Sequence, residues 1–173
     1  MVDPEKFCIR KYRKGDEHEI IELLDLVFDG WPKIDLPCSK LDHWRWKYPD
    51  RPIKGLIAAI TTYEDKIIGC SHSPYLYLKV GDNIHFCENG GDLAVHPDFR
   101  GMKIWVNMIK KWNTEKWALN IVGFSNSSHP SVVNRAKSQN AVGLPSPVKH
   151  YCRIKDIDKF LKAKNIPNLM VKK

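Results

Sequence analysis

The 173-residue sequence has no apolar run that approaches the roughly 20 residues needed to span a bilayer. Its N-terminus, MVDPEKFCIR, begins with charges and a proline and lacks the apolar core of a secretory signal. The five cysteines are odd in number and far apart, which indicates buried, reduced thiols and argues against a disulfide framework. These absences predict a cytoplasmic protein with no membrane-spanning segment.

Signatures of several common chemistries are missing as well. The seven histidines and five cysteines show no C-x-x-C or H-E-x-x-H spacing, so we expect no metal site. The P-loop pattern G-x-x-x-x-G-K-[ST] and the hydrolase pattern G-x-S-x-G are also absent, which argues against both enzyme classes. No internal repeat or low-complexity tract interrupts the chain.

The formal net charge of +8 favours a polyanionic partner, which could be a nucleotide-like cofactor, a nucleic acid or an acidic surface. The alternative is a solubilising charge with a basic tail, because KAKNIPNLMVKK at the C-terminus carries four of the lysines. Net charge alone leaves both interpretations open.

The segment DHWRWKY mixes basic and aromatic residues, as binders of single-stranded nucleic acid do. Trp44 and Tyr48 are four residues apart, however, so a helix half in the core, with Arg45 and Lys47 outside, is the simpler interpretation. We therefore expect no nucleic-acid partner.

Hydrophobic patterning predicts strands and helices in a mixed order. Asp16 begins the first helix, with Glu19 completing a capping box, and Ser39 caps a short helix that Pro49 ends. The predicted strands are 6–12, 55–63, 66–72, 75–80, 84–95, 120–125 and 148–154, with later helices at 103–116, after His129, and from Asp156. Hairpins turn at Glu64-Asp65 and at Gly81-Asp82. This order makes the fold α+β.

The stretch DLAVHPDFRGMKIW, residues 92–105, combines a strand, a polar corner and the start of a helix. A helix begins with backbone N–H groups that lack partners within it, and its dipole favours negative charge there. A basic, glycine-containing corner before such a helix therefore predicts a phosphate site.

Within this stretch, LAVHPDFRGMKI resembles the acetyl-CoA signature of the GCN5-related N-acetyltransferase (GNAT) superfamily. The segments IRKYRKGDEHEIIELL, WRWKY and DKIIGCSHSPYLYLKVGDN support the resemblance, which covers residues 6–155 and is similar to a subgroup from surface-polysaccharide and aminoglycoside contexts. It implies a mixed, mostly antiparallel sheet of six to seven strands flanked by helices, with central strands splayed to admit the pantetheine arm.

The function implied is an N-acyltransferase that moves an acetyl group from acetyl-CoA to a primary amine of a small molecule or sugar by direct attack. The alternative is a catalytically weak or inactive module of the same fold that binds CoA or a protein. We expect an acyltransferase domain at 1–155 and a C-terminal helix and basic tail at 156–173. Acetyl-CoA and a small amine are the expected partners, and a homodimer stays open.

The resemblance also implies which residues bind the cofactor. They are Leu93, Ala94, Val95, Arg100, Gly101, Met102, Lys103, Ile104, Trp105 and Asn126. The Gly90-Gly91 pair predicts the bulge that opens the sheet, although a kink in an edge strand is the alternative. Lys103 and Trp105 stand where the superfamily has small residues, so they restrict the approach of phosphate; Trp105 could instead pack in the core.

Acyl transfer needs a base for the ammonium and a proton donor for the thiolate. Glu88, four residues before Asp92 on the same strand, is the first candidate base, and Asp92 is the second. Each has a simpler alternative: Glu88 as a solvated charge and Asp92 as a structural hydrogen-bond acceptor.

The superfamily's proton donor is usually a tyrosine within a pattern like N-x-x-A-x-x-x-Y. From Asn126, that tyrosine position falls on or near Val133, and no tyrosine lies in that helix. Tyr151, His129 and Ser128 are the remaining candidates, and we select Tyr151.

Overall fold

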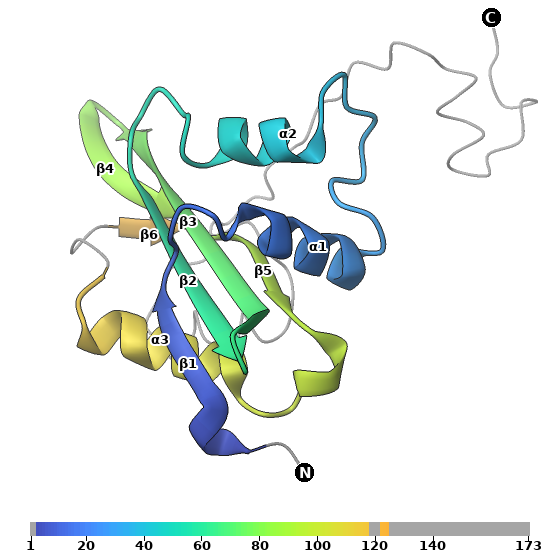
Figure 1. Cartoon of the computed structure of the whole chain (residues 1–173). Helices are drawn as coiled ribbons and strands as arrows, with labels where there is room; N and C mark the ends of the chain where they lie inside the picture. The colour runs from blue at the N-terminus through green and yellow to red at the C-terminus, as the bar shows by residue number, and fades with distance from the viewer. Residues whose placement is uncertain (1–2, 118–121, 125–173) are drawn as a thin grey trace, which may run out of the picture. The chain divides into compact units, whose positions relative to one another are not determined.

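A computed structural model describes residues 3–117 and 122–124, which belong to the first of two compact units, Met1–Ser125. In chain order the elements are η1 (Pro4–Lys6), β1 (Phe7–Lys11), α1 (Glu17–Phe28), α2 (Lys40–Lys47), β2 (Leu56–Tyr63), β3 (Lys66–Val80), β4 (Asn83–Asn89), β5 (Gly91–Val95), η2 (Pro97–Phe99), α3 (Ile104–Thr114) and β6 (Val122–Phe124). This mixed arrangement confirms the predicted α+β class (Figure 1).

The described strands form one sheet in the order β1-β2-β3-β4-β6, with β5 paired to β3 beside that path. Every pairing is antiparallel except the parallel pairing of β4 with β6. The mixed, mostly antiparallel sheet is therefore confirmed. The predicted strand at 148–154 lies outside the described residues, so the count of six to seven strands stays a prediction for the whole chain.

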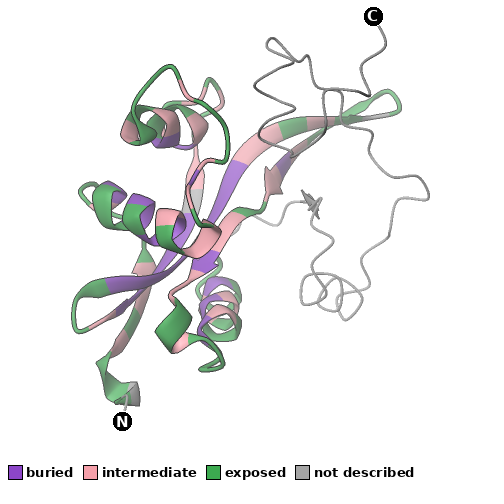
Figure 2. Cartoon of the chain, turned by 90° about the vertical axis from the view of Figure 1, so that its right-hand side faces the viewer, coloured by how far each residue is buried: buried purple, intermediate pink, exposed green. Residues whose placement is uncertain are grey.

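Helices cover both faces of the sheet, and Figure 2 shows their buried sides turned toward it. One group of buried residues, the α1–α2-side core, consists of Ile20, Ile21, Leu23, Leu24, Trp31, Trp44, Tyr48, Ile60, Ile67, Cys70 and Ala94. The other group, the α3-side core, consists of Ala59, Ile68, Ile104, Met108, Trp112 and Trp117. The sheet thus separates two apolar layers, as a half-buried α+β sheet requires.

The local signals in the sequence have different outcomes. Ser39 caps α2 by accepting a hydrogen bond from Asp42 N at 3.0 Å, which confirms the prediction. The predicted capping box on α1 is wrong. Asp16 instead binds Arg10 at 2.7 and 2.8 Å, and Glu19 accepts from Ile67 N at 3.0 Å.

Both predicted hairpins are present. Glu64 and Asp65, between β2 and β3, have φ values of 48° and 65°, as the favoured two-residue hairpin turn requires.

Gly55, at the entrance to β2, has φ 121°, and a Cβ placed there would lie 2.0 Å from Cδ2 of Tyr75. The Tyr75 ring therefore packs in space that only glycine leaves open.

Candidate active site

The strand that carries the signature is interrupted at Gly90, between the end of β4 and the start of β5. His72 of β3 pairs with Gly91 and Cys70 pairs with Ala94, so β5 carries one residue more than β3 over this interval. Asp92 lies in that interval with φ 41°, in the left-handed region. The predicted bulge is confirmed, but its unusual conformation falls on Asp92 instead of on Gly90 or Gly91.

The pairing of the sheet changes at this bulge. Upstream of it, β4 pairs in parallel with β6 through Cys87–Asn89. Downstream of it, β5 pairs only with β3 among the described residues. His96 N donates to Ile68 O at 2.8 Å, so by antiparallel alternation Ala94 directs its main-chain groups to β3 and Val95 directs its own away from β3. We call the side of β5 that faces away from β3 the slot.

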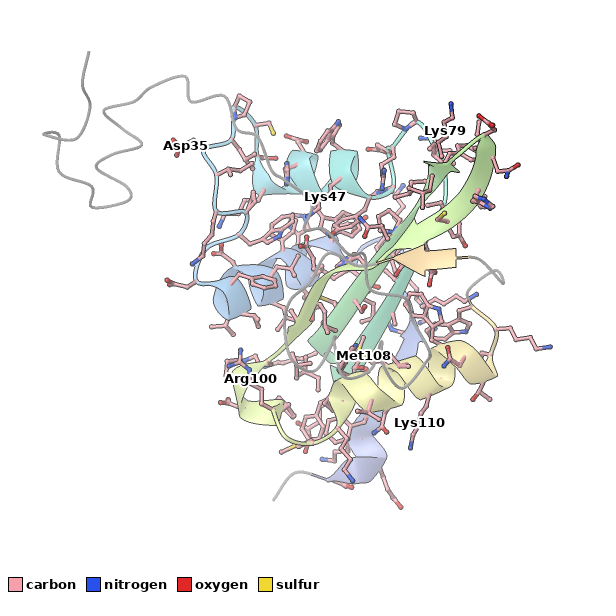
Figure 3. The ribbon with its side chains drawn as sticks, turned by 180° about the vertical axis from the view of Figure 1, so that it is seen from behind. Asp35, Lys47, Lys79, Arg100, Met108 and Lys110 are labelled. Atoms are coloured by element: carbon pink, nitrogen blue, oxygen red, sulfur yellow. The ribbon has the colours of Figure 1, made fainter. Side chains whose placement is uncertain are left out.

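Downstream of β5, the chain turns through η2 into the basic corner before α3. Arg100, Gly101, Met102 and Lys103 are all exposed there. Gly101 has φ 83° and Lys103 has φ 58°, so a lysine occupies a backbone conformation that favours glycine. Figure 3 shows Arg100 at this turn and Lys110 further along the following helix.

Trp105 lies in the first turn of α3. The buried face of this helix consists of Ile104, Met108 and Trp112, whereas Trp105 is only half-buried and lies outside that cluster. Trp105 is therefore close in sequence to the corner and is not among the residues of the α3-side core.

Asp92 is the centre of a partly buried polar cluster on the α1–α2 side of the sheet. Its Oδ2 accepts hydrogen bonds from Trp31 Nε1 at 3.0 Å, Lys47 Nζ at 2.8 Å and Tyr48 Oη at 2.5 Å. Lys47 therefore turns inward to a partly buried carboxylate, and the expectation that it points outside is wrong. Trp44 and Tyr48 are buried and Arg45 is exposed, as predicted.

The protonation states in this cluster follow from burial and charge. Burial would raise the pKa of Asp92, but hydrogen bonds from Lys47 and Tyr48 outweigh it and hold that pKa below its ordinary value of 3.8. Burial, followed by the charge of Asp92, raises the pKa of Tyr48 far above its ordinary value. Asp92 is consequently ionised and Tyr48 is a neutral donor at neutral pH.

His72 contacts the main chain of Asp92, whereas the other three donors contact its side chain. Trp44 Nε1 lies 3.3 Å from His72 Nε2, and because an indole can only donate, Nε2 accepts and Nδ1 carries the proton. Nδ1 then donates to the Asp92 carbonyl oxygen at 3.1 Å. The ring is fully buried and stacks on Tyr48 at 4.2 Å, and burial lowers the pKa of His72 to about 4, so it is neutral.

Glu88 lies on the opposite face of the sheet from Asp92. It pairs directly with Tyr75 in the β3–β4 ladder, so both side chains project from the same face, and Tyr75 packs against the α3-side core. Glu88 is half-buried, and its Oε2 is shielded from solvent. The two candidate bases therefore lie in different environments, on opposite faces of the sheet.

Some of the predicted site residues are not described by the structure, and some residues of the observed cluster were not predicted. Asn126, Ser128, His129 and Tyr151 lie outside the described residues. The sequence interpretation missed Trp31 and His72 as parts of the site. His72 follows Cys70 at the two-residue period of a buried strand face, and that signal could have identified it as a buried polar group.

Residues 3–117 and 122–124 contain no group of three or more His, Cys, Asp or Glu side chains that could hold a metal ion. No helix in this part is long and apolar enough to cross a membrane.

No protein-family model matches the sequence, and no curated protein matches it. Solved structures do match. An aminoglycoside acetyltransferase, meta-AAC0020, from an uncultured soil metagenomic sample in complex with trehalose is 19% identical, with a TM-score of 0.57 over 88% of this chain and 99% of that one. Glucosamine-6-phosphate N-acetyltransferase from Arabidopsis thaliana is 15% identical, with a TM-score of 0.57 over 87% and 99% of the two chains.

A predicted acetyltransferase from Clostridium acetobutylicum, solved with acetyl-CoA, is 12% identical, with a TM-score of 0.61 over 84% of this chain and 96% of that one. At these identities the likeness establishes the fold alone. The chain has the fold of the GNAT acetyltransferases, as the sequence resemblance implied.

Proposed function

We propose that the protein is an N-acyltransferase that moves an acetyl group from acetyl-CoA to a primary amine of a small molecule or sugar by direct attack. One observation carries the proposal. The slot beside β5 begins at the Asp92 bulge and leads along one strand to the exposed basic corner at the start of α3. A ligand with an extended amide-containing arm and a pyrophosphate fits this order of features.

The chain's own groups supply the contacts such a ligand needs. Val95 offers a main-chain N–H and C=O to the amides of the arm, in the manner of an added strand. Arg100 and Lys103 offer positive charge, and the first turn of α3 adds the field of its dipole. The remaining corner residues and Leu93 would line the same path, and Asn126 stays a prediction.

The chemical step requires the attacking amine to lose a proton. Glu88 is the proposed base because its carboxylate is shielded and lies at the mouth of the slot, one residue before Asn89 at the end of β4. Backbone N–H groups of the slot would polarise the thioester carbonyl as charge develops on its oxygen. Tyr151 stays the proposed proton donor to the departing thiolate.

Amino sugars are the proposed first class of acceptor. Two of the similar structures are an aminoglycoside acetyltransferase and a glucosamine-6-phosphate N-acetyltransferase, and both are named for amine-bearing carbohydrates. A small polyamine or a peptide amine suits the same chemistry. An acceptor panel should therefore pair each amino sugar with the corresponding sugar that has a hydroxyl in place of the amine.

Calorimetric titration with CoA and acetyl-CoA tests the proposal directly. We expect saturable binding at near-physiological salt that weakens in Arg100→Ala and stays unchanged in Lys110→Ala, which removes the same charge from an exposed position further along α3. Absence of binding at millimolar CoA overturns the proposal. Binding without acyl transfer to any amine of the panel would support the module that binds CoA and is catalytically inactive.

A further inference from the structure

Asp92 is fixed through its side chain and its main chain at once. Its carboxylate accepts hydrogen bonds from Trp31, Lys47 and Tyr48, and its carbonyl accepts one from His72. All four donors come from outside β5. Asp92 therefore connects the bulge to both β3 and the α1–α2 segment.

The backbone at Asp92 needs such support. Its φ of 41° lies in the left-handed region, which aspartate tolerates better than most residues but which still costs free energy outside glycine. Conformations of this kind persist where surrounding contacts over-determine them. Here a neutral buried imidazole holds the carbonyl and three donors hold the carboxylate, so the surroundings meet that condition.

These same contacts oppose a role for Asp92 as a base. An ammonium, a phenol and an indole all donate to Oδ2, and hydrogen bonds to the ionised carboxylate stabilise it and make it a weaker proton acceptor. Protonation of this carboxylate would also remove the counter-charge of Lys47 and weaken the hydrogen bonds from Lys47 and Tyr48 in a partly buried site. The geometry suits a fixed anion that organises its neighbours.

We propose that Asp92 is a positioning residue that locks the β5 bulge in its left-handed conformation and so keeps the slot open for the acyl-CoA arm. The inference rests on the proposed function for the identity of the guest. The lock itself consists of Asp92, His72, Tyr48, Lys47 and Trp31. It acts on cofactor affinity through the main chain of β5 and touches neither of the reacting groups.

The lock makes a prediction that a catalytic base does not. Asp92→Asn removes the charge of the acceptor that Trp31, Lys47 and Tyr48 share, and Tyr48→Phe removes one of its donors. A hydrogen bond to a charged acceptor is typically worth about tenfold or more in an equilibrium constant. Both variants should therefore weaken CoA binding by about tenfold, raise KM for acetyl-CoA more than they lower kcat, and leave the pH profile of kcat unchanged. The double variant should be less than additive because both changes break the same contact.

Two histidine variants test the carbonyl side of the lock. In His72→Asn the amide N–H group lies near the position of Nδ1 and can still donate to the Asp92 carbonyl. In His72→Gln the amide lies near Nε2, so it can still accept from Trp44 but no longer donates to Asp92. CoA affinity should be closer to that of the parent in His72→Asn than in His72→Gln, and the reverse order would overturn the role given to Nδ1.

The matched control is Asp65→Asn, an aspartate with φ 65° in the β2–β3 turn, which should leave CoA binding unchanged. The indole N–H resonance of Trp31 and the amide exchange rates of residues 91–96 report on the lock without any ligand. We expect Asp92→Asn to shift the Trp31 resonance and to accelerate exchange at the His96 amide.

These measurements separate the lock from the proposed function. If the parent binds no CoA, the proposed function fails, and accelerated exchange in Asp92→Asn still supports the lock while unchanged exchange overturns it. If the parent binds CoA and Asp92→Asn binds it equally well but loses kcat with an altered pH profile, Asp92 is a catalytic base and the inference is overturned. Lys47→Met provides a further test should Asp92→Asn fail to fold.

Discussion

Glu88 lies directly opposite Tyr75 in the β3–β4 ladder, on the face of the sheet that carries α3. Burial and the charge of Glu88 both raise the pKa of Tyr75, so its phenol keeps its proton at neutral pH. A carboxylate and a phenol that keeps its proton therefore project from the same face of the sheet.

Glu88→Gln should lower kcat/KM for the best amine by at least about 10²-fold while CoA affinity stays unchanged, because the amide keeps the shape but cannot accept the proton. Glu64→Gln is the matched control, since Glu64 lies in the β2–β3 turn and pairs with Lys6. Steady-state kinetics across pH measures both variants. A Glu88→Gln enzyme with the parent's rate and pH profile would remove Glu88 from the mechanism.

Lys103→Gly should raise the free energy of unfolding by about 1 kcal/mol, because glycine adopts φ 58° without the cost that a lysine incurs there. Lys116→Gly is the matched control, since Lys116 has φ 49° just after α3 and lies outside the basic corner. Thermal unfolding should show both variants stabilised to a similar extent.

The same pair of variants tests what Lys103 does to a bound phosphate. If its side chain obstructs the pyrophosphate, Lys103→Gly should tighten CoA binding, further so when combined with Trp105→Gly, whereas Lys116→Gly should not. Calorimetry with CoA gives the answer. Weaker binding by Lys103→Gly with an intact fold would instead make Lys103 a ligand of the phosphate.

Stability should fall as the pH drops from about 6.5 to about 4, because His72 has its pKa lowered from 6.5 to about 4 in the folded protein. In that window the unfolded chain binds a proton that the folded protein excludes, so protons favour unfolding. The groups around the ring are Asp92, Lys47, Tyr48 and Cys70, of which the first two are charged. The lowered pKa of Asp92 adds a further loss at more acidic pH.

Denaturant unfolding between pH 7 and pH 4.5 measures this dependence. His72→Asn should flatten the curve over the window, with a difference on the order of a few kcal/mol across it. His18→Asn, on the exposed side of α1, is the control and should keep the parent's pH dependence. Parallel curves for the parent and His72→Asn would show that His72 does not exclude its proton.

Gly55→Ala should destabilise the fold by about 2–4 kcal/mol, because the new methyl group meets the Tyr75 ring and the backbone has φ 121°. The control is Gly81→Ala, which has φ 59° in a turn with nothing within 4 Å of the added carbon. Equilibrium denaturation should show the larger loss at Gly55. Equal losses would mean that backbone conformation alone, and not the contact with Tyr75, sets the cost.

Much of the fold follows from signals that act over a few residues. The four-residue spacing of Trp44 and Tyr48 gives the buried face of α2, Ser39 gives its start, and the Glu64-Asp65 turn gives the first hairpin. Each signal depends on neighbours in the same element, so periodicity and turn chemistry are sufficient to find it.

The candidate site depends on partners that lie far apart in the sequence. Trp31 and Asp92 are separated by 61 residues, and helical periodicity alone assigns a lysine such as Lys47 to solvent. The capping box on α1 does not form because partners from other elements bind its two carboxylates: Arg10 of β1 binds Asp16, and the Ile67 amide of β3 binds Glu19. A pattern along the chain does not show which charged side chain will meet a partner from another element.

The continuous course of β3 restricts how the slot can respond to a guest. This single strand of 15 residues holds β5 through Gly69–His72 and β4 through Tyr75–Val80. Neither neighbour can slide lengthwise without breaking its ladder of hydrogen bonds, whereas strands in a sheet twist readily about one another. The position of the slot along β3 is therefore fixed, and only its width can change as this strand twists.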